Sequence, residues 1–186
     1  MIRKQAFIHF NEQPFKNLID RIYEVAPEVD TATSSEKDPD NQRHSDVSWI
    51  DPKDEHKDIF EFINEAMNNA NQQSEWHFDV PIIEPLQFTE YKVGQRYDWH
   101  VDQFMGYEDT IRKISFSILL NDDFEGGEFE IEAGSPAKSA EDRIHKINLK
   151  KGDGLFFPSY TWHRVRPVTK GTRHSLVGWC RGPQWR

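Results

Sequence analysis

The first 75 residues carry hydrophobic positions at helical spacing. One run follows Pro14, at Phe15, Leu18, Ile19, Ile22 and Ala26. A second run has the same period, at Ile59, Phe62, Ile63, Ala66, Met67 and Ala70. Asp51 and Pro52 precede the second run as a predicted N-cap and first helical residue. This spacing predicts two helices, each with one apolar face, and the polar residues 31–46 between them predict an exposed loop.

After about Glu75 the pattern changes to short runs of β-branched and aromatic residues separated by Gly, Pro and Asp. These runs lie at 85–93, 111–121, 127–132, 143–149, 154–158, 163–168 and 173–180. Closely spaced strands without intervening helices indicate a β-sandwich or jelly roll rather than a doubly wound sheet. We therefore expect a mainly β fold with N-terminal helices. It would form one domain over residues 1–186, in which 1–75 are mostly helical support and 76–186 are the jelly-roll core.

Composition narrows the class of protein. The net charge is −9, which argues against a nucleic-acid backbone or an anionic membrane as the main partner. The single cysteine, Cys180, excludes an intrachain disulfide and a Cys-rich zinc site, and it fits a reducing compartment. No apolar run reaches the roughly 18 residues of a membrane span, and the first residues lack the apolar segment of a secretory signal. These features predict a cytoplasmic protein and leave its oligomeric state open.

Basic residues are concentrated near the C-terminus. Residues 160–186 contain six basic side chains and no acidic one. A solvated strand edge would have this composition, and so would the wall of a pocket for an anionic small molecule. The second interpretation gains weight only if other functional residues converge on the segment.

Histidines and carboxylates supply the candidate metal ligands. Two histidines and one carboxylate on one face of an ion are typical of non-haem Fe(II) centres, and His-x-Asp on a strand aims both side chains the same way. The sequence contains four such triplets, at 44–46, 56–58, 77–79 and 100–102. His44 in the polar loop and His56 near a helix start are expected to face solvent, and His77 lies on the polar face of its segment. His100 and Asp102 end a strand beside a Gly-containing turn, so they are the favoured pair.

A third ligand has to come from a distant strand. The candidates are His145, His163 and His174. His145 is expected to face outward, whereas His163 begins a strand whose hairpin partner starts at Arg173. An arginine that points into a core is unfavourable unless it meets an anion, and a carboxylate matches its fork.

At these residues the sequence resembles a known family. The segment 91–179 is similar to the 2-oxoglutarate- and Fe(II)-dependent dioxygenases, and most to the prolyl 4-hydroxylase-like branch that is related to PKHD-type hydroxylases. The shared motifs are Y-x-x-G-x-x-Y-x-x-H-x-D (91–102), L-L-N-D-D-F-E-G-G-E (119–128), G-D-x-L-x-F (152–157) and H-x-V-x-P-V-x-x-G-x-R (163–173). The resemblance implies a double-stranded β-helix, a distorted jelly roll, buttressed by the N-terminal helices.

The resemblance also implies roles for individual residues. His100, Asp102 and His163 would hold Fe(II), and Arg173 would bind the C5 carboxylate of 2-oxoglutarate. Tyr91 and Trp179 would line the cosubstrate pocket, although both would also suit a plain hydrophobic core. The sequence departs from the family at Leu119, where many relatives carry a tyrosine that hydrogen-bonds the same carboxylate. Tyr91 or a Ser or Thr hydroxyl could replace that donor.

By resemblance, the chemistry is hydroxylation of an unactivated C–H bond with O₂ and 2-oxoglutarate, releasing succinate and CO₂, with ascorbate as an optional reductant. Peptidyl proline is the first candidate substrate, and a small molecule is the alternative. A nucleic-acid oxygenase of the same fold is disfavoured by the net charge of −9. A non-enzymatic metal-binding jelly roll used as a sensor stays open. Residues 28–50 and 103–111 are expected to form the pocket rim.

Overall fold

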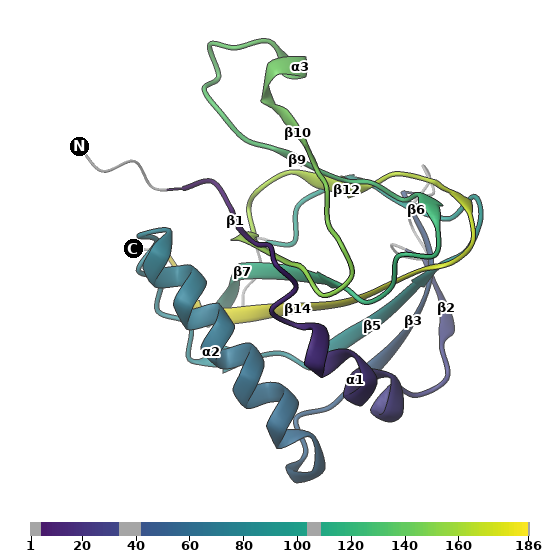
Figure 1. The fold of residues 1–186 in the computed structure, drawn as a ribbon. Helices are drawn as coiled ribbons and strands as arrows, with labels where there is room; N and C mark the ends of the chain where they lie inside the picture. The colour runs from purple at the N-terminus through teal and green to yellow at the C-terminus, as the bar shows by residue number, and fades with distance from the viewer. Residues whose placement is uncertain (1–4, 34–41, 104–108, 186) are drawn as a thin grey trace.

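The protein was analysed as a computed structural model that describes residues 5–33, 42–103 and 109–185. In this part of the chain, twelve strands form one antiparallel sheet that curls over itself, and two helices lie against its outer side (Figure 1). The double-stranded β-helix expected from the resemblance is confirmed.

The sheet has two layers joined at β3. The first layer contains, in spatial order, β1 (Ile8–Phe10), β11 (Gly154–Pro158), β7 (Thr110–Leu119), β14 (Arg173–Pro183), β5 (Leu86–Tyr91) and β3 (Arg43–Ile50). The second layer continues with β6 (Arg96–His100), β12 (His163–Val165), β9 (Phe129–Glu132) and β10 (Ile144–Ile147). Short strands complete it: β2 (Asp30–Thr33) on β3, β4 (Ile82–Ile83) on β14, and a separate pair of β8 (Glu125–Gly126) with β13 (Val168–Lys170). The end of β3 pairs with β5 and its beginning with β6, so β3 carries the sheet from one layer to the other.

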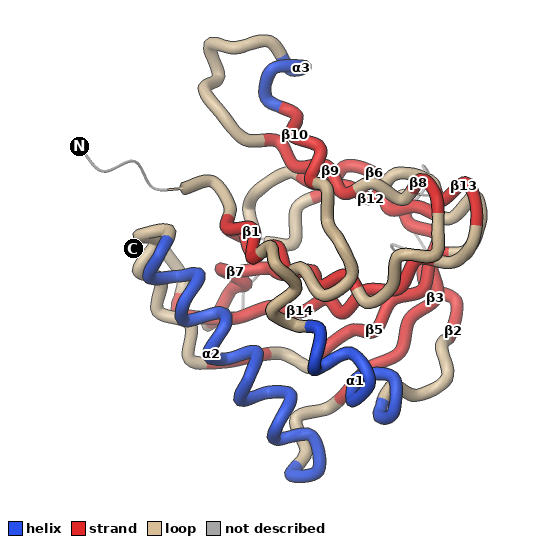
Figure 2. Tube along the Cα trace, in the orientation of Figure 1, coloured by secondary structure: helices blue, strands red, loops and turns tan. Residues whose placement is uncertain are grey.

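The helices cover the outer side of the first layer. The 3₁₀ turn Lys16–Leu18 leads into α1 (Ile19–Val25), and the turn Asp54–His56 leads into α2 (Lys57–Gln73). Figure 2 shows both helices on the same side of the strands, whereas the short α3 (Ala140–Arg143) sits on an arm that extends beyond β9 and β10. The buried α2 residues Ile59, Ile63, Met67 and Ala70 lie in one apolar cluster with the outward-facing strand residues. The predicted helix faces are therefore confirmed.

The structure corrects three details of the N-terminal third. Residues 31–46, expected to be a loop, contain the end of β2 and the start of β3, while 34–41 lie outside the described residues. Asp51 is not an N-cap, because the helical turn begins at Asp54 and follows Lys53 as its cap. Residues 1–75 therefore contribute three strands as well as helical support. Strand β3 escaped prediction because its inward positions include polar residues, so it shows no apolar alternation, whereas β6 is the strand that His100 was expected to end.

Candidate active site

Two histidines and an aspartate meet where β6 and β12 lie side by side. His100 ends β6, His163 begins β12, and the two residues are direct partners across the strand pair. Asp102 is the second residue after the end of β6. Its carboxylate oxygens lie 3.6 Å from His100 Nε2 and 3.5 Å from His163 Nε2. The three ligand atoms all lie within 4.8 Å of one another, so a single ion could contact all of them.

The main chain orients both imidazoles. His100 Nδ1 lies 2.7 Å from the Asp98 carbonyl oxygen, and His163 Nδ1 lies 2.9 Å from the Thr161 carbonyl oxygen. Because a carbonyl only accepts, each Nδ1 donates and each Nε2 carries the lone pair. Both Nε2 atoms, which lie beside Asp102, therefore have a free lone pair, as histidine ligands of a metal ion require.

Burial sets the charge of the three side chains. Burial, with the neighbouring His163, lowers the pKa of His100 to about 3, so that imidazole is neutral at pH 7. Burial alone would raise the pKa of the Asp102 carboxyl, but the adjacent imidazoles of His163 and His100 outweigh it and the pKa is lowered. The site therefore pairs a neutral nitrogen ligand with a carboxylate, a donor set suited to a divalent cation.

A cavity between the two layers contains this group. Its volume is about 860 Å³, including the part that is open to solvent. Besides the three candidate ligands, the lining includes Arg43, Trp49, Gln87, Tyr91, Tyr97, Arg112, Ser117, Phe157, Ser175 and Trp179. Trp49 is 45% exposed and stands at the rim, with its ring 6.1 Å from that of Trp179. The cavity thus combines polar and charged groups with apolar side chains such as Phe129 and Val165, and its rim carries an exposed aromatic ring.

Arg173 is a buried cation beside this cavity. Its side chain is 1% exposed, and Nη1 donates to Ser175 Oγ at 3.0 Å. The guanidinium carbon lies 5.7 Å from the centre of the Tyr91 ring, and Tyr91 and Ser175 both line the cavity. Burial lowers the pKa of Arg173 to about 10, which still leaves it charged at pH 7. No carboxylate of the described residues lies within ion-pair distance, so the geometry calls for an anionic ligand.

Gly127 makes room for this arginine. It has a φ of +62°, and a Cβ at this position would lie 2.9 Å from Arg173 Cδ. A larger residue would therefore be strained and would also press on the arginine stem. Gly127 therefore leaves space for the Arg173 side chain that a larger residue would fill.

The comparisons with known proteins agree with this geometry. The family model described as the 2OG-Fe(II) oxygenase superfamily matches residues 86–181, which is more than half of the chain. The chain belongs to the 2OG-Fe(II) oxygenase superfamily.

Individual relatives of this oxygenase carry related names. A PKHD-type hydroxylase of Gloeothece citriformis is 41% identical over 100 residues, covering 52% of this chain and 42% of the relative. Another, of Thermosynechococcus vestitus, is 34% identical over 131 residues, covering 68% of this chain and 55% of the relative. The chain therefore spans only about half the length of these relatives. Their names confirm the PKHD-related resemblance.

Solved structures share the fold. A Pseudomonas putida prolyl-4-hydroxylase has a TM-score of 0.70 at 21% identity, over 96% of this chain and 94% of that one. A Trichoplax adhaerens prolyl hydroxylase, solved with a hypoxia inducible factor peptide fragment, has a TM-score of 0.66 at 15% identity, over 94% and 83% of the two chains. At these identities the likeness establishes the fold alone.

The residues of this oxygenase fit the groups that its family uses. The two aligned lone pairs and the Asp102 carboxylate suit Fe(II), and unpaired Arg173 suits the distal carboxylate of 2-oxoglutarate. Trp179 lines the same cavity and lies close to Asp102, since its indole N–H helps to lower the pKa of that carboxyl.

Of the predicted cosubstrate residues, Tyr91 and Trp179 line the same cavity as the candidate ligands, and Tyr91 contacts Arg173. Leu119 is buried and is the partner of Ser175 across β7 and β14. It supplies no hydrogen bond, as expected, and the hydroxyl that lies closest to the arginine is that of Ser175, at 3.0 Å.

The other histidines lie elsewhere. His44 faces solvent from β3, not from a loop, and His77 and His145 are exposed as expected. His56, expected to face solvent, is instead buried, and its Nδ1 donates to the Asp51 carbonyl oxygen at 2.8 Å. His174 lies on the opposite face from Arg173, where it contacts Tyr23 and Glu90.

Sequence reasoning missed the cationic part of the cavity. Arg43 and Arg112 both line it, and Arg112 stacks 3.9 Å over the Trp179 ring while binding both oxygens of Glu84. Alternate residues of β3, namely Arg43, Ser45, Val47 and Trp49, point to the same side of the strand. The presence of an arginine and a tryptophan on that side was the sequence signal that could have identified this wall of the cavity. Arg43 and Trp49 do come from the predicted rim segment 28–50; the other rim prediction, 103–111, lies largely in residues outside the description.

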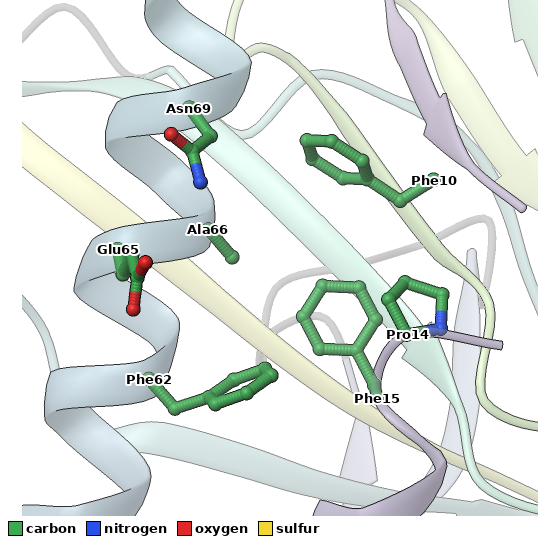
Figure 3. A pocket seen from close by; sticks show the side chains of 7 residues that line it. All are labelled: Phe10, Pro14, Phe15, Phe62, Glu65, Ala66 and Asn69. Carbon is green, nitrogen blue, oxygen red and sulfur yellow. The ribbon is translucent and has the colours of Figure 1, made fainter.

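A second cavity lies on the outer side of the sheet. It is smaller, about 460 Å³, and sits between α2 and the chain that precedes α1 (Figure 3). Phe10, Phe15 and Phe62 surround it, with Glu65 and Asn69 on its helix side. It has one titratable side chain and therefore lacks the means to bind a metal or an anion.

No helix within the described ranges has the length and apolar character needed to cross a membrane.

Proposed function

We propose that the protein hydroxylates an unactivated C–H bond of a second substrate, using Fe(II), O₂ and 2-oxoglutarate and releasing succinate and CO₂. The observation that carries the proposal is the proximity of three metal-ligand side chains to a buried, unpaired arginine: the cavity that contains the ligands is lined by Ser175 and Tyr91, and both of these contact Arg173. A site that merely held a structural metal would have no need of such an arginine.

His100, Asp102 and His163 would hold the metal. Bound Fe(II) with 2-oxoglutarate and O₂ supplies the oxidising chemistry, which protein side chains cannot provide. The protein keeps both Nε2 lone pairs available by holding Nδ1–H on the carbonyls of Asp98 and Thr161. These contacts fix the rings before a metal arrives and so reduce the entropy lost on binding.

The rest of the cavity would position the cosubstrate. Arg173 would bind the C5 carboxylate with its fork, and the Ser175 and Tyr91 hydroxyls lie on the side where Leu119 supplies no donor. The indole N–H of Trp179 would donate to the Asp102 carboxylate and help to orient it. Enclosure strengthens each of these contacts because little water competes for them.

A prolyl residue of a peptide is the substrate that we propose first. The mouth of the cavity presents the rings of Trp49 and Trp179, and pyrrolidine rings dock on aromatic surfaces. Two proteins of the same fold are named as prolyl hydroxylases, and one of them was solved with a peptide. We place the reaction in the cytoplasm, since the only cysteine is buried and unpaired.

The proposal is tested by incubating the protein with Fe(II), 2-oxoglutarate, O₂ and a library of proline-containing peptides and small metabolites. We expect succinate in equal amount to a product that has gained one oxygen atom, and neither with Asp102→Ala. Metal and 2-oxoglutarate binding without succinate from any substrate would favour the non-enzymatic sensor. Oxidation of a metabolite but of no peptide would retain the chemistry and reject peptidyl proline.

A further inference from the structure

Arg43 places a second cation inside the candidate active site. It is the first residue of β3, at the point where this strand passes from β5 to β6, and its direct partner on β6 is Tyr97. Its guanidinium carbon lies 5.0 Å from the centre of the Tyr97 ring, and that ring stacks on His100 at 3.5 Å between centres. The cation is therefore separated from a candidate metal ligand by a single aromatic ring.

The guanidinium of Arg43 is only partly satisfied. Nε donates to Ser45 Oγ at 2.9 Å. Nη2 is buried and has no hydrogen-bond partner among the described residues, and no described carboxylate forms an ion pair with it. Arg112, the other arginine in the wall, differs in that both oxygens of Glu84 hold it, at 2.9 and 2.6 Å. A buried donor without a partner is energetically unfavourable, so its presence at a cavity wall indicates a missing ligand group.

The charges of the site indicate the kind of group. This step rests on the proposed function. The charges of Fe(II), the Asp102 carboxylate, Arg173 and the 2-oxoglutarate dianion cancel, and Arg112 is paired with Glu84, which also contacts Arg181. Tyr91 and Tyr97 stay neutral because burial raises the pKa of each phenol. The positive charge of Arg43 is left without a counterpart when metal and cosubstrate are both in place.

We propose that Arg43 binds a carboxylate of the substrate that is hydroxylated, and that it selects substrates carrying this group close to the oxidised carbon. The carboxylate has two chemically equivalent sources: the main-chain carboxylate of a free or C-terminal residue, or the side chain of an acidic residue next to the target in a peptide. Arg43 would act as a specificity-determining residue, separate from the arginine that holds the cosubstrate.

The test uses the protein loaded with redox-inert Mn(II) and 2-oxoglutarate, and ligand-observed NMR measures the dissociation constant of each probe. One arm compares N-acetyl-L-proline with its amide, which differs only in the main-chain carboxylate. The other compares N-acetyl-Asp-Pro-amide and N-acetyl-Pro-Asp-amide with their Asn counterparts. We expect one acidic probe to bind wild type roughly tenfold or more tightly than its neutral partner, as a charge-assisted contact would give. The arm in which this happens identifies the source of the carboxylate.

Three variants make the result specific. Arg43→Gln should remove the preference for the acidic probe and leave 2-oxoglutarate affinity unchanged, and Arg43→Lys should restore part of the preference. Arg166→Gln removes an exposed arginine on the second layer and should change neither quantity. Equal binding of every acidic and neutral pair, absence of binding by all probes, or a preference that survives Arg43→Gln would overturn the assignment. Failure of the wild type to bind 2-oxoglutarate would instead reject the proposed function, so the two failures are distinguishable.

Discussion

The two faces of the first sheet layer have opposite chemistry. Along β7 the outward residues Ile114, Phe116 and Ile118 are fully buried against the helices. The inward residues Ser115 and Ser117 alternate with them and are equally inaccessible. Neighbouring strands repeat the contrast, since inward Thr89, Ser175 and Arg173 lie beside outward Phe88 and Leu176.

This contrast separates stability from function within one sheet. Strand residues alternate between faces, so one segment can supply an apolar core on one side and small polar groups on the other. Small hydroxyls on the inner face leave space for a ligand, whereas bulky residues there would close the cavity. We therefore expect outward substitutions to change mainly the free energy of unfolding, and inward substitutions to change mainly metal and cosubstrate binding.

The largest effect is expected at the metal-ligand residues. Replacing His100, Asp102 or His163 by Ala should abolish 2-oxoglutarate turnover, because two remaining ligands cannot hold the ion in facial geometry. Succinate formation measures this, and Mn(II) titration should show the matching loss of metal affinity. His77→Ala, in an exposed His-x-Asp triplet, is the control. If His77→Ala were inactive and His100→Ala active, the choice among the four triplets would be wrong.

A substitution on the outward face should instead lower the free energy of unfolding. Phe156 is fully buried, and its ring contacts those of Phe10, Phe15 and Phe116 at centre distances of 5.4, 6.1 and 5.2 Å. Phe156→Ala should lower the free energy of unfolding by about 3–5 kcal/mol, through lost transfer energy and the cavity left behind. Denaturant titration measures this.

The matched inward substitution is Ser117→Ala. It removes one hydroxyl from the cavity wall and should change the free energy of unfolding by less than about 1.5 kcal/mol. Equal destabilisation by Phe156→Ala and Ser117→Ala would contradict the division of labour between the two faces.

A substitution of Arg173, on the inward face, should change the affinity for 2-oxoglutarate. Arg173→Ala should raise the apparent 2-oxoglutarate constant roughly tenfold to a few hundredfold, since a charge-assisted contact contributes about 1.5–3 kcal/mol. Metal affinity should change little, and Arg173→Lys should recover only part of the loss because it replaces a fork by a point charge. His174→Ala, on the opposite face of the same strand, is the control. A wild-type 2-oxoglutarate constant in Arg173→Ala would leave the cosubstrate assignment without its main support.

The free energy of unfolding should also depend on pH. The pKa of His100 falls from 6.5 to about 3 on folding, because burial and His163 disfavour its charged form. Below about pH 6.5 the unfolded chain takes up a proton that the folded metal-free protein does not, so stability is complete above that pH and declines toward pH 3. The slope from this residue is at most about 1.4 kcal/mol per pH unit. Denaturant titrations across this range should show a shallower decline for His100→Gln; identical curves would contradict a buried neutral imidazole.

The helices and most long strands were predictable because their signals are local. Residues 57–73 and 110–119 each carry a complete period within one element. The pairing of β3 with β6, in contrast, joins segments separated by about fifty residues of sequence and is fixed only by the curl of the sheet. No local pattern reveals that Arg43 faces the same cavity as His100, since this depends on that pairing.

The site was predictable to a different degree. The motifs predicted His100, Asp102, His163 and Arg173 as site residues, and the structure brings ligand atoms of the first three within 4.8 Å of one another. It also shows how the remaining histidines differ: the buried His56 ring is held by the main-chain carbonyl of Asp51 and lies outside the group of possible metal ligands found among the described residues. Burial of this kind depends on packing between elements, which residue spacing does not report.

We propose that metal and 2-oxoglutarate bind together in this site. The most direct test is calorimetric titration of 2-oxoglutarate into the wild-type protein with and without Mn(II), in the absence of any second substrate. We expect binding that strengthens markedly when the metal is present, because the metal and Arg173 would hold opposite ends of the same molecule. Equal binding with and without Mn(II), or no binding in either case, would contradict it.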